Sequence, residues 1–291
     1  VGDMGAVTKE MRNEFTAAGV NHVLSISGLH VSMLGLVVFW LVRFGCSYST
    51  YLTLRCNLVK VGTFFSFMAV VFYTAIAGAM VPTVRSAIMI GVYELAVLLD
   101  REEEVFASLT FAALIIGLIW PAVIADISFQ LSFLAVLFIV WGMRRMMDGS
   151  PRRPRDELPQ ERSWWKHKLQ QGRLHLAVPL FATLGTGPLI AHYFGHLSLA
   201  GFISNPVIVP LVGFIVVPLG LVTGFLSLIL PSAAGILVWP AEYLLSATLW
   251  LVRLLAHLPL ANVAVPVPNA LEVTALYLFI VALFLLRRNR F

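Results

Sequence analysis

The sequence predicts an all-α, polytopic membrane helix bundle with about nine spanning helices, an outer interfacial amphipathic helix and a re-entrant segment. Three observations support this fold class. Of the 291 residues, 59% are hydrophobic. Only 12% are charged, whereas soluble domains average about 25% charged residues. Apolar runs of about 17 to 25 residues, the length that crosses a bilayer as a helix, recur along the chain.

Residues 4–19 predict the amphipathic helix, with Thr8 as its cap and Gly19 at its end. Apolar side chains recur at helical spacing on one face, and charged side chains lie opposite. Because the segment is too polar to span a bilayer, we expect it at the membrane interface.

Nine apolar runs predict the spanning helices. A shorter apolar stretch at 198–210 contains Asn205, Pro206 and Pro210, and it predicts a re-entrant half-helix. The nine runs are 23–44, 58–79, 83–99, 105–121, 128–147, 174–195, 211–230, 235–258 and 270–286.

Basic residues predict the orientation. The polar segment 148–173 is rich in arginine and lysine, so the positive-inside rule places it in the cytoplasm. Counting crossings from this loop places the C-terminus in the cytoplasm and the N-terminus outside. The start at Val1, without an initiator methionine, suggests a piece of a longer polypeptide. The expected regions are the outer amphipathic helix 1–22, a first transmembrane half 23–147, the cytoplasmic basic loop 148–173 and a second transmembrane half 174–291.

The first polar motif is HVLSISGLHV at residues 22–31. Unpaired polar groups in hydrocarbon cost several kcal/mol, so intramembrane His and Ser usually face a bundle interior or a wet cavity. Alternatively, the serines bond to their own helix and the imidazoles cap neighbouring helices. Gly28 permits a bend or a close backbone approach. The candidate lining residues here are His22, Ser25, Ser27, Gly28 and His30.

The second motif, PTVRS at 82–86, places Arg85 just inside an apolar run. This guanidinium either extends to the outer interface or stays inside to attract phosphate or pair with a carboxylate.

The third motif, DISFQLS at 126–132, opens the fifth span. Asp126 is either a plain helix N-cap or part of the lining of a polar vestibule. Gln130 and Ser132 are candidates for the lining of a polar vestibule.

The fourth motif begins with LGTGP at 184–188. Gly185 and Gly187 predict an interrupted helix of the kind that forms transporter sites. The alternative is a face on which helices pack closely. The candidate residues are Thr186, His192 and Asn205.

The sequence contains no motif for ATP, dinucleotide or conventional zinc binding, so we expect no cofactor and no metal. Cys46 and Cys56 form no paired framework and are expected to be free thiols.

Taken together, the motifs resemble the competence domain of ComEC-type DNA-uptake proteins. The resemblance rests on GDMGAVTKEMRNEFTAAGVNHVLSISGLHV at the start, PTVRSAIM at 82–89, ISFQLSFLAV at 127–136 and LGTGPLIAHYFGHLSLAGFISNPVIVPL from 184, in the family's order. It covers nearly the whole chain and is weakest at 148–173 and in the last span.

The resemblance implies a multi-pass channel in the bacterial cytoplasmic (inner) membrane that passes single-stranded DNA inward during natural transformation. Its implied partners are membrane lipid, DNA-delivery proteins outside and a cytoplasmic helicase. Family members commonly add an OB-like domain and a metallo-β-lactamase-like nuclease domain, and this chain has neither. We therefore expect it to conduct DNA rather than act as an enzyme.

Two other functions are compatible with the residues. A small-molecule secondary transporter would share the polar midplane groups. An intramembrane serine protease would use Ser27 as nucleophile and His192 as base, but Ser25 stands where the GxSG pattern needs glycine.

Overall fold

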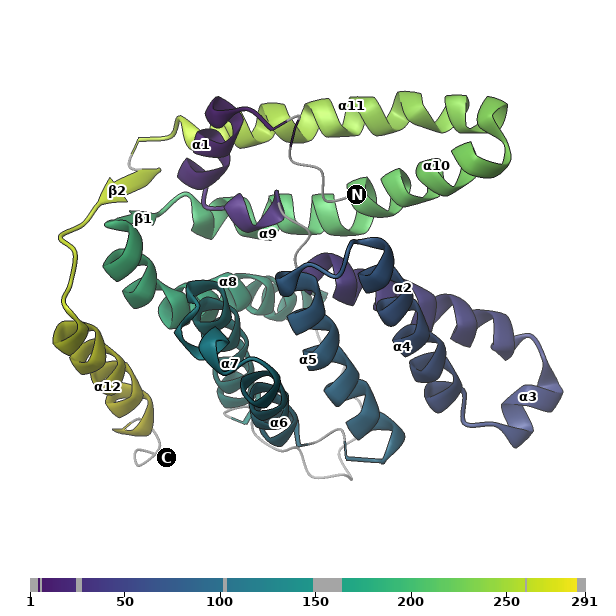
Figure 1. Ribbon diagram of the computed structural model, residues 1–291, viewed down its shortest axis with the longest axis horizontal. Helices are drawn as coiled ribbons and strands as arrows, with labels where there is room; N and C mark the ends of the chain where they lie inside the picture. The colour runs from purple at the N-terminus through teal and green to yellow at the C-terminus, as the bar shows by residue number, and fades with distance from the viewer. Residues whose placement is uncertain are drawn as a thin grey trace.

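The computed structural model describes residues 5, 7–24, 28–101, 104–148, 164–259 and 261–286. Over these residues the chain is a bundle of α-helices with one short pair of strands (Figure 1), which confirms the predicted fold class. The elements of the first half are α1 (Lys9–Ala17), η1 (Asn21–Val23), α2 (Gly28–Ser47), α3 (Thr50–Arg55), α4 (Leu58–Ile76), α5 (Val81–Leu98), α6 (Val105–Ile119), η2 (Pro121–Ala125) and α7 (Ile127–Asp148). Those of the second half are α8 (Trp164–Phe194), β1 (His196–Ser198), α9 (Gly201–Leu211), η3 (Val212–Val216), α10 (Val217–Ile229), α11 (Pro231–Ala256), β2 (Asn262–Ala264) and α12 (Ala270–Leu286).

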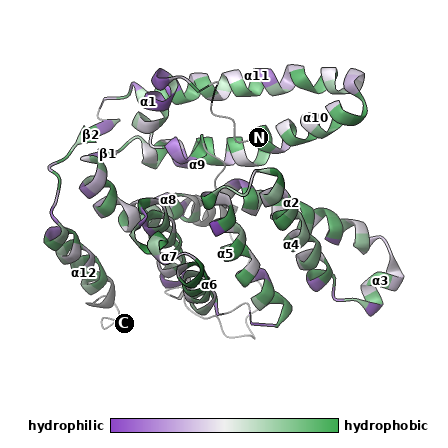
Figure 2. Ribbon diagram, in the orientation of Figure 1, coloured by the Kyte–Doolittle hydropathy of each residue, from purple (hydrophilic) through white to green (hydrophobic). Residues whose placement is uncertain are grey.

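The long helices have the length and composition of membrane spans. Among the described residues seven helices meet both criteria, and α6 and α12 are shorter apolar helices. Hydrophobic residues run along nearly every long helix, whereas α1 is largely hydrophilic (Figure 2). Leu118, Leu228 and Trp239 are each 81% exposed. Exposed apolar side chains in such number mark a surface that a bilayer covers.

The first half packs through small and polar residues. The buried face of α4 consists of Gly62, Thr63, Ser66, Val70 and Thr74. A Cβ on Gly62 would lie 2.9 Å from the Phe39 ring of α2, so only glycine allows this approach. Small residues at such contacts are typical of helix packing in membranes.

The second half packs at the glycines of the fourth motif. α8 continues without a break from Trp164 to Phe194, so the predicted interruption at Gly185 and Gly187 is wrong. A Cβ on Gly185 would lie 2.8 Å from the Leu134 carbonyl oxygen of α7. The Tyr277 hydroxyl of α12 donates to the Gly185 carbonyl at 2.7 Å. Gly185 therefore serves close packing.

The predicted re-entrant segment at 198–210 is also wrong. α9, η3 and α10 form one continuous helix from Gly201 to Ile229, with a π-helical turn at Val212–Val216. An 18-residue window within this run has a mean hydropathy of 2.4, and an apolar environment favours a helix that keeps most backbone hydrogen bonds internal. Pro206 and Pro210 lie inside the helix without ending it.

The predicted cytoplasmic basic loop at 148–173 stays a prediction, although the apolar span of α8 begins at Gly172, close to its predicted end. α7 ends at Asp148 and α8 already begins at Trp164. Residues 149–163 lie outside the described residues.

The predicted amphipathic helix is present as α1. The Thr8 hydroxyl accepts from the Met11 backbone N–H at 3.2 Å, which confirms the cap. Gly19, with a φ of +74°, ends the segment. The apolar face does not lie open, because Phe15 and Ala18 pack with Ile208 of α9 and with α11. Glu14 accepts from Arg253 of α11 at 3.2 Å.

Replacing Phe15 with alanine is expected to release α1. Phe15 is 4% exposed, and deleting a buried phenyl ring costs about 3 to 5 kcal/mol. The amides of Lys9–Ala17 should then exchange faster in hydrogen–deuterium exchange measured by mass spectrometry. Phe214→Ala, at a ring that is 54% exposed, is the matched control and should leave this exchange unchanged. Equal exchange in the two variants would contradict the packing assigned to Phe15.

Candidate functional site

The first and second motifs meet where α2 and α5 begin. A Cβ added to Gly28 would collide with the Ser86 hydroxyl, so the two helices touch at this glycine. Ser86 is 8% exposed and donates to the Pro82 carbonyl of its own helix at 2.8 Å. His30, two residues further along α2, is also buried. Ser25 and Ser27 lie outside the described residues, so their predicted roles are untested.

The second and third motifs meet through an ion pair. Arg85 is 7% exposed, so its guanidinium is covered by protein. Its Nη1 lies 3.9 Å from Asp126 Oδ1. Asp126 Oδ1 also accepts from the Phe129 backbone N–H at 3.0 Å, which confirms the N-cap at the start of α7. Arg85 Nε and Nη1 have no hydrogen-bond partner within the described part of the chain. The guanidinium thus has a counter-charge and unused donors.

The third and fourth motifs meet through Gln130 and Tyr193. The Tyr193 hydroxyl donates to Gln130 Oε1 at 3.3 Å, and Gln130 Nε2 donates to the Ile124 carbonyl at 3.1 Å. Beside Tyr193, the Nδ1 of His192 lies 2.6 Å from the Pro268 carbonyl oxygen. Gln130 therefore ties the start of α7 to the end of α8.

The region of the fourth motif contacts the segment just before the first motif. The Ser198 hydroxyl donates to the Ala17 carbonyl at 2.7 Å. The Ser204 hydroxyl, fully buried, donates to the Ala18 carbonyl at 2.6 Å. The four motifs are thus linked in a series that closes through Ala17 and Ala18, just before the first motif, and we call this set of contacts the motif circuit. Its links are Gly28–Ser86, Arg85–Asp126, Gln130–Tyr193, Ser198–Ala17 and Ser204–Ala18.

Three other predicted residues take no part in the motif circuit. The Thr186 hydroxyl donates to the Ala182 carbonyl of its own helix at 2.8 Å. Asn205 Nδ2 donates to the Gly201 carbonyl at 2.8 Å, while its buried Oδ1 has no partner among the described residues. Ser132 is half-buried on α7.

Sequence reasoning did not select Ser86, Tyr193, Ser198 or Ser204. Each stands inside or beside a quoted motif, but residue type alone does not show which of several neighbouring hydroxyls reaches another helix.

His22 lies in η1, before the first span. The surrounding protein desolvates the His22 imidazole. This desolvation, with a smaller effect of the charge on His30, lowers the pKa of His22 from 6.5 to about 4. His22 is therefore neutral at pH 7.

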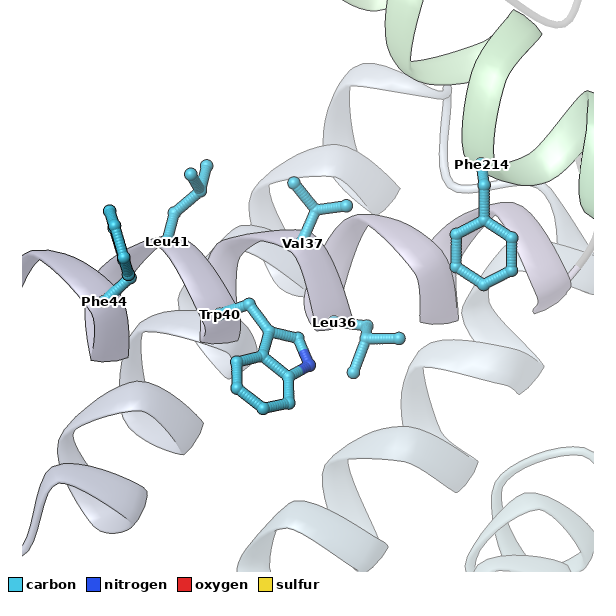
Figure 3. A pocket seen from close by; sticks show the side chains of 6 residues that line it. All are labelled: Leu36, Val37, Trp40, Leu41, Phe44 and Phe214. Atoms are coloured by element: carbon cyan, nitrogen blue, oxygen red, sulfur yellow. The ribbon is translucent and has the colours of Figure 1, made fainter. Parts of the chain in front are cut away.

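An apolar groove lies elsewhere. It has a volume of about 490 Å³ and is lined by Leu36, Val37, Trp40, Leu41 and Phe44 of α2 with Phe214 of η3 (Figure 3). Its wholly apolar lining is typical of a surface that faces lipid. It contains no residue of the motif circuit.

The fold and the motif circuit define a multi-pass α-helical membrane protein whose polar motifs gather between helices. The model of the competence protein family matches residues 1–290, so the chain belongs to this family. It is 28% identical over 294 residues to ComE operon protein 3 of Bacillus subtilis, covering 98% of this chain and 33% of the relative. It is 25% identical over 271 residues to competence protein ComA of Neisseria gonorrhoeae, covering 92% and 35% of the respective chains. A third relative, the uncharacterised protein YcaI of Escherichia coli, is 25% identical over 219 residues, covering 75% of this chain and 27% of the relative.

This chain thus spans about a third of the length of these relatives. No solved structure matches it.

Replacing Gly28 with alanine is expected to destabilise the bundle, because the new Cβ would collide with Ser86. Overpacking of this kind costs about 1 to 3 kcal/mol, which thermal unfolding in detergent would measure. The double variant Gly28→Ala/Ser86→Gly should recover stability, since it removes the colliding side chain. Gly45→Ala, in open space on the same helix, is the control and should not lower the unfolding temperature. A double variant no more stable than Gly28→Ala would contradict the contact.

His22 is expected to react with diethyl pyrocarbonate, which attacks neutral imidazole, even at pH values between 6.5 and its folded-state pKa of about 4. In a peptide, where the pKa of histidine is about 6.5, the reaction slows as the pH falls below 6.5. Because folding lowers the pKa of His22, the unfolded chain binds this proton more tightly than the native protein does. The native protein is therefore destabilised at His22 as the pH falls from 6.5 towards 4. Peptide mapping measures the rate at which diethyl pyrocarbonate modifies His22. If this rate falls with a midpoint at the pKa of histidine in a peptide, about 6.5, the lowered pKa is refuted.

Proposed function

We propose that this chain forms a channel in the bacterial inner membrane that passes single-stranded DNA into the cytoplasm during natural transformation. The observation that carries the proposal is the motif circuit, in which four polar motifs far apart in the sequence join at the starts of α2, α5 and α7 and the end of α8. Membership of the competence family supports the same function.

The proposed path needs weak contacts with phosphate, because a conducted strand must leave as well as enter. Arg85 suits this requirement. Its charge is partly balanced by Asp126 at 3.9 Å, and its free N–H donors point to a phosphate as an additional ligand. Arg253, a further basic residue within a predicted span, 235–258, pairs with Glu14.

In this proposal the N-terminus and the motif circuit lie on the outer side, and the C-terminus lies in the cytoplasm. The chain conducts and does not cleave DNA. The remaining parts of the full-length protein would supply the OB-like and nuclease domains, and a cytoplasmic helicase and outer DNA-delivery proteins would act at either end.

Replacing Arg85 with glutamine in the full-length protein is expected to lower uptake of labelled DNA roughly tenfold or more. The loss of a charge-assisted contact costs about 1.5 kcal/mol or more, and 1.4 kcal/mol corresponds to a factor of ten. Internalised label and transformant number are measured at equal protein level. Arg101→Gln is the matched control, because Arg101 is exposed and pairs only with nearby Glu104 in the described structure.

A second variant separates function from folding. Arg85→Gln alone leaves Asp126 without its partner, whereas Arg85→Gln/Asp126→Asn removes both charges. The proposal expects the double variant to regain stability but not uptake. Recovery of normal uptake would assign the ion pair a structural role and contradict a phosphate contact at Arg85.

A further inference from the structure

A carboxyl group lies buried in the first bundle, away from the motif circuit. Glu94 is on α5 and is 8% exposed. It is nine residues from Arg85, about 13.5 Å along the helix at 1.5 Å per residue. Ionisable side chains inside spans are rare and usually functional.

The surroundings of Glu94 come from α2 and α4. The side chain of Ser66 of α4, itself 4% exposed, lies next to the Glu94 carboxyl group. At Gly35 of α2, the position of an added Cβ is 2.8 Å from Ser66 Oγ and 4.0 Å from Glu94 Oε1. The absence of a side chain at Gly35 leaves this space open. Glu94 Oε2 is buried and has no hydrogen-bond partner in the described ranges.

No cation within the described structure pairs with Glu94. Lys60 bonds to Asp100 at 2.7 Å, Arg85 lies next to Asp126, and Arg43 lies over the Trp40 ring. α6 has no titratable side chain between Val105 and Ile119. The other titratable side chains on the described helices around Glu94 are His30 and Cys46 on α2, Tyr73 on α4 and Tyr93 on α5.

We propose that Glu94 and Ser66 form a proton-binding site inside the membrane. A buried carboxylate without a counter-ion is unfavourable, and binding a proton removes its charge. The Ser66 hydroxyl donates a hydrogen bond to the ionised carboxylate and accepts one from the protonated acid, so one pair of side chains serves both states. The contacts involved are separate from the motif circuit, and the proposal does not rest on DNA conduction.

Dicyclohexylcarbodiimide provides a chemical test, because this apolar reagent reacts with protonated carboxyl groups. The acid O–H adds across one C=N bond, and the acyl group then migrates to nitrogen, so the whole reagent stays attached and nothing leaves. The full-length protein in liposomes is treated at about pH 7.5, where ordinary glutamate is ionised. Peptide mass spectrometry should find the adduct on Glu94.

Two variants serve as controls. Glu94→Gln should lose the adduct, whereas Glu242→Gln, at an exposed position on α11, should retain it. Above the midpoint of titration, each pH unit should slow labelling about tenfold, because the protonated fraction falls tenfold. Replacing choline chloride with sodium chloride at constant pH should have no effect.

Infrared spectroscopy gives a second measurement that does not depend on access of the reagent. The C=O stretch of a protonated carboxylic acid should be present at about pH 7.5 in the unmodified protein and absent in Glu94→Gln. Absence of both the adduct and this band would overturn the proposal. Protection of Glu94 by sodium would also overturn it and would identify a sodium site.

Discussion

The structure depends on one constraint: a polar group inside an apolar bundle must find its partner within the protein. An arginine at the centre of a span costs about 2.5 to 3.5 kcal/mol even on a lenient scale. Arg85 is buried, and its counter-charge comes from Asp126, which in turn caps α7. The pair therefore fixes the start of α5 against the start of α7. Gln130, one turn into α7, extends the same connection to Tyr193 of α8.

The same constraint determines where glycine is needed. The hydroxyls that meet other segments are short, so the backbones must come close together. A Cβ on Gly19 would lie 2.7 Å from Ser198 Oγ, and one on Gly28 would collide with Ser86. Glycine at position 19 allows the end of the α1 segment to lie close to Ser198, and glycine at position 28 allows α2 to lie close to Ser86 of α5. The polar motifs and their glycines therefore act as packing units, whether or not a substrate passes between them.

The fold was predictable from the sequence because apolar runs and basic loops are local signals. α1, its Thr8 cap and the cap at Asp126 follow from short-range patterns, and the structure contains them. The interruption of α8 and the re-entrant segment were wrong. Glycine and proline have the same local signature in a broken helix and in a closely packed continuous one, and only the neighbouring helices decide between them. The pairings of the motif circuit join residues up to 186 positions apart, which no local pattern encodes.

Helix α2 connects these features mechanically. Gly28 and Gly35 are seven residues apart, two turns along nearly the same face of the helix. Each lies against a serine, Ser86 of α5 and Ser66 of α4. On another face, Met33 packs onto Gly213 in the π-helical turn of the second half. A shift of α2 at Gly35 thus cannot occur without changing the contacts at Gly28 and at Gly213, because a helix transmits displacement along its length. The Glu94–Ser66 site and the motif circuit also share α5, which carries Glu94, Arg85 and Ser86, so both helices give a physical route between the membrane interior and the polar motifs.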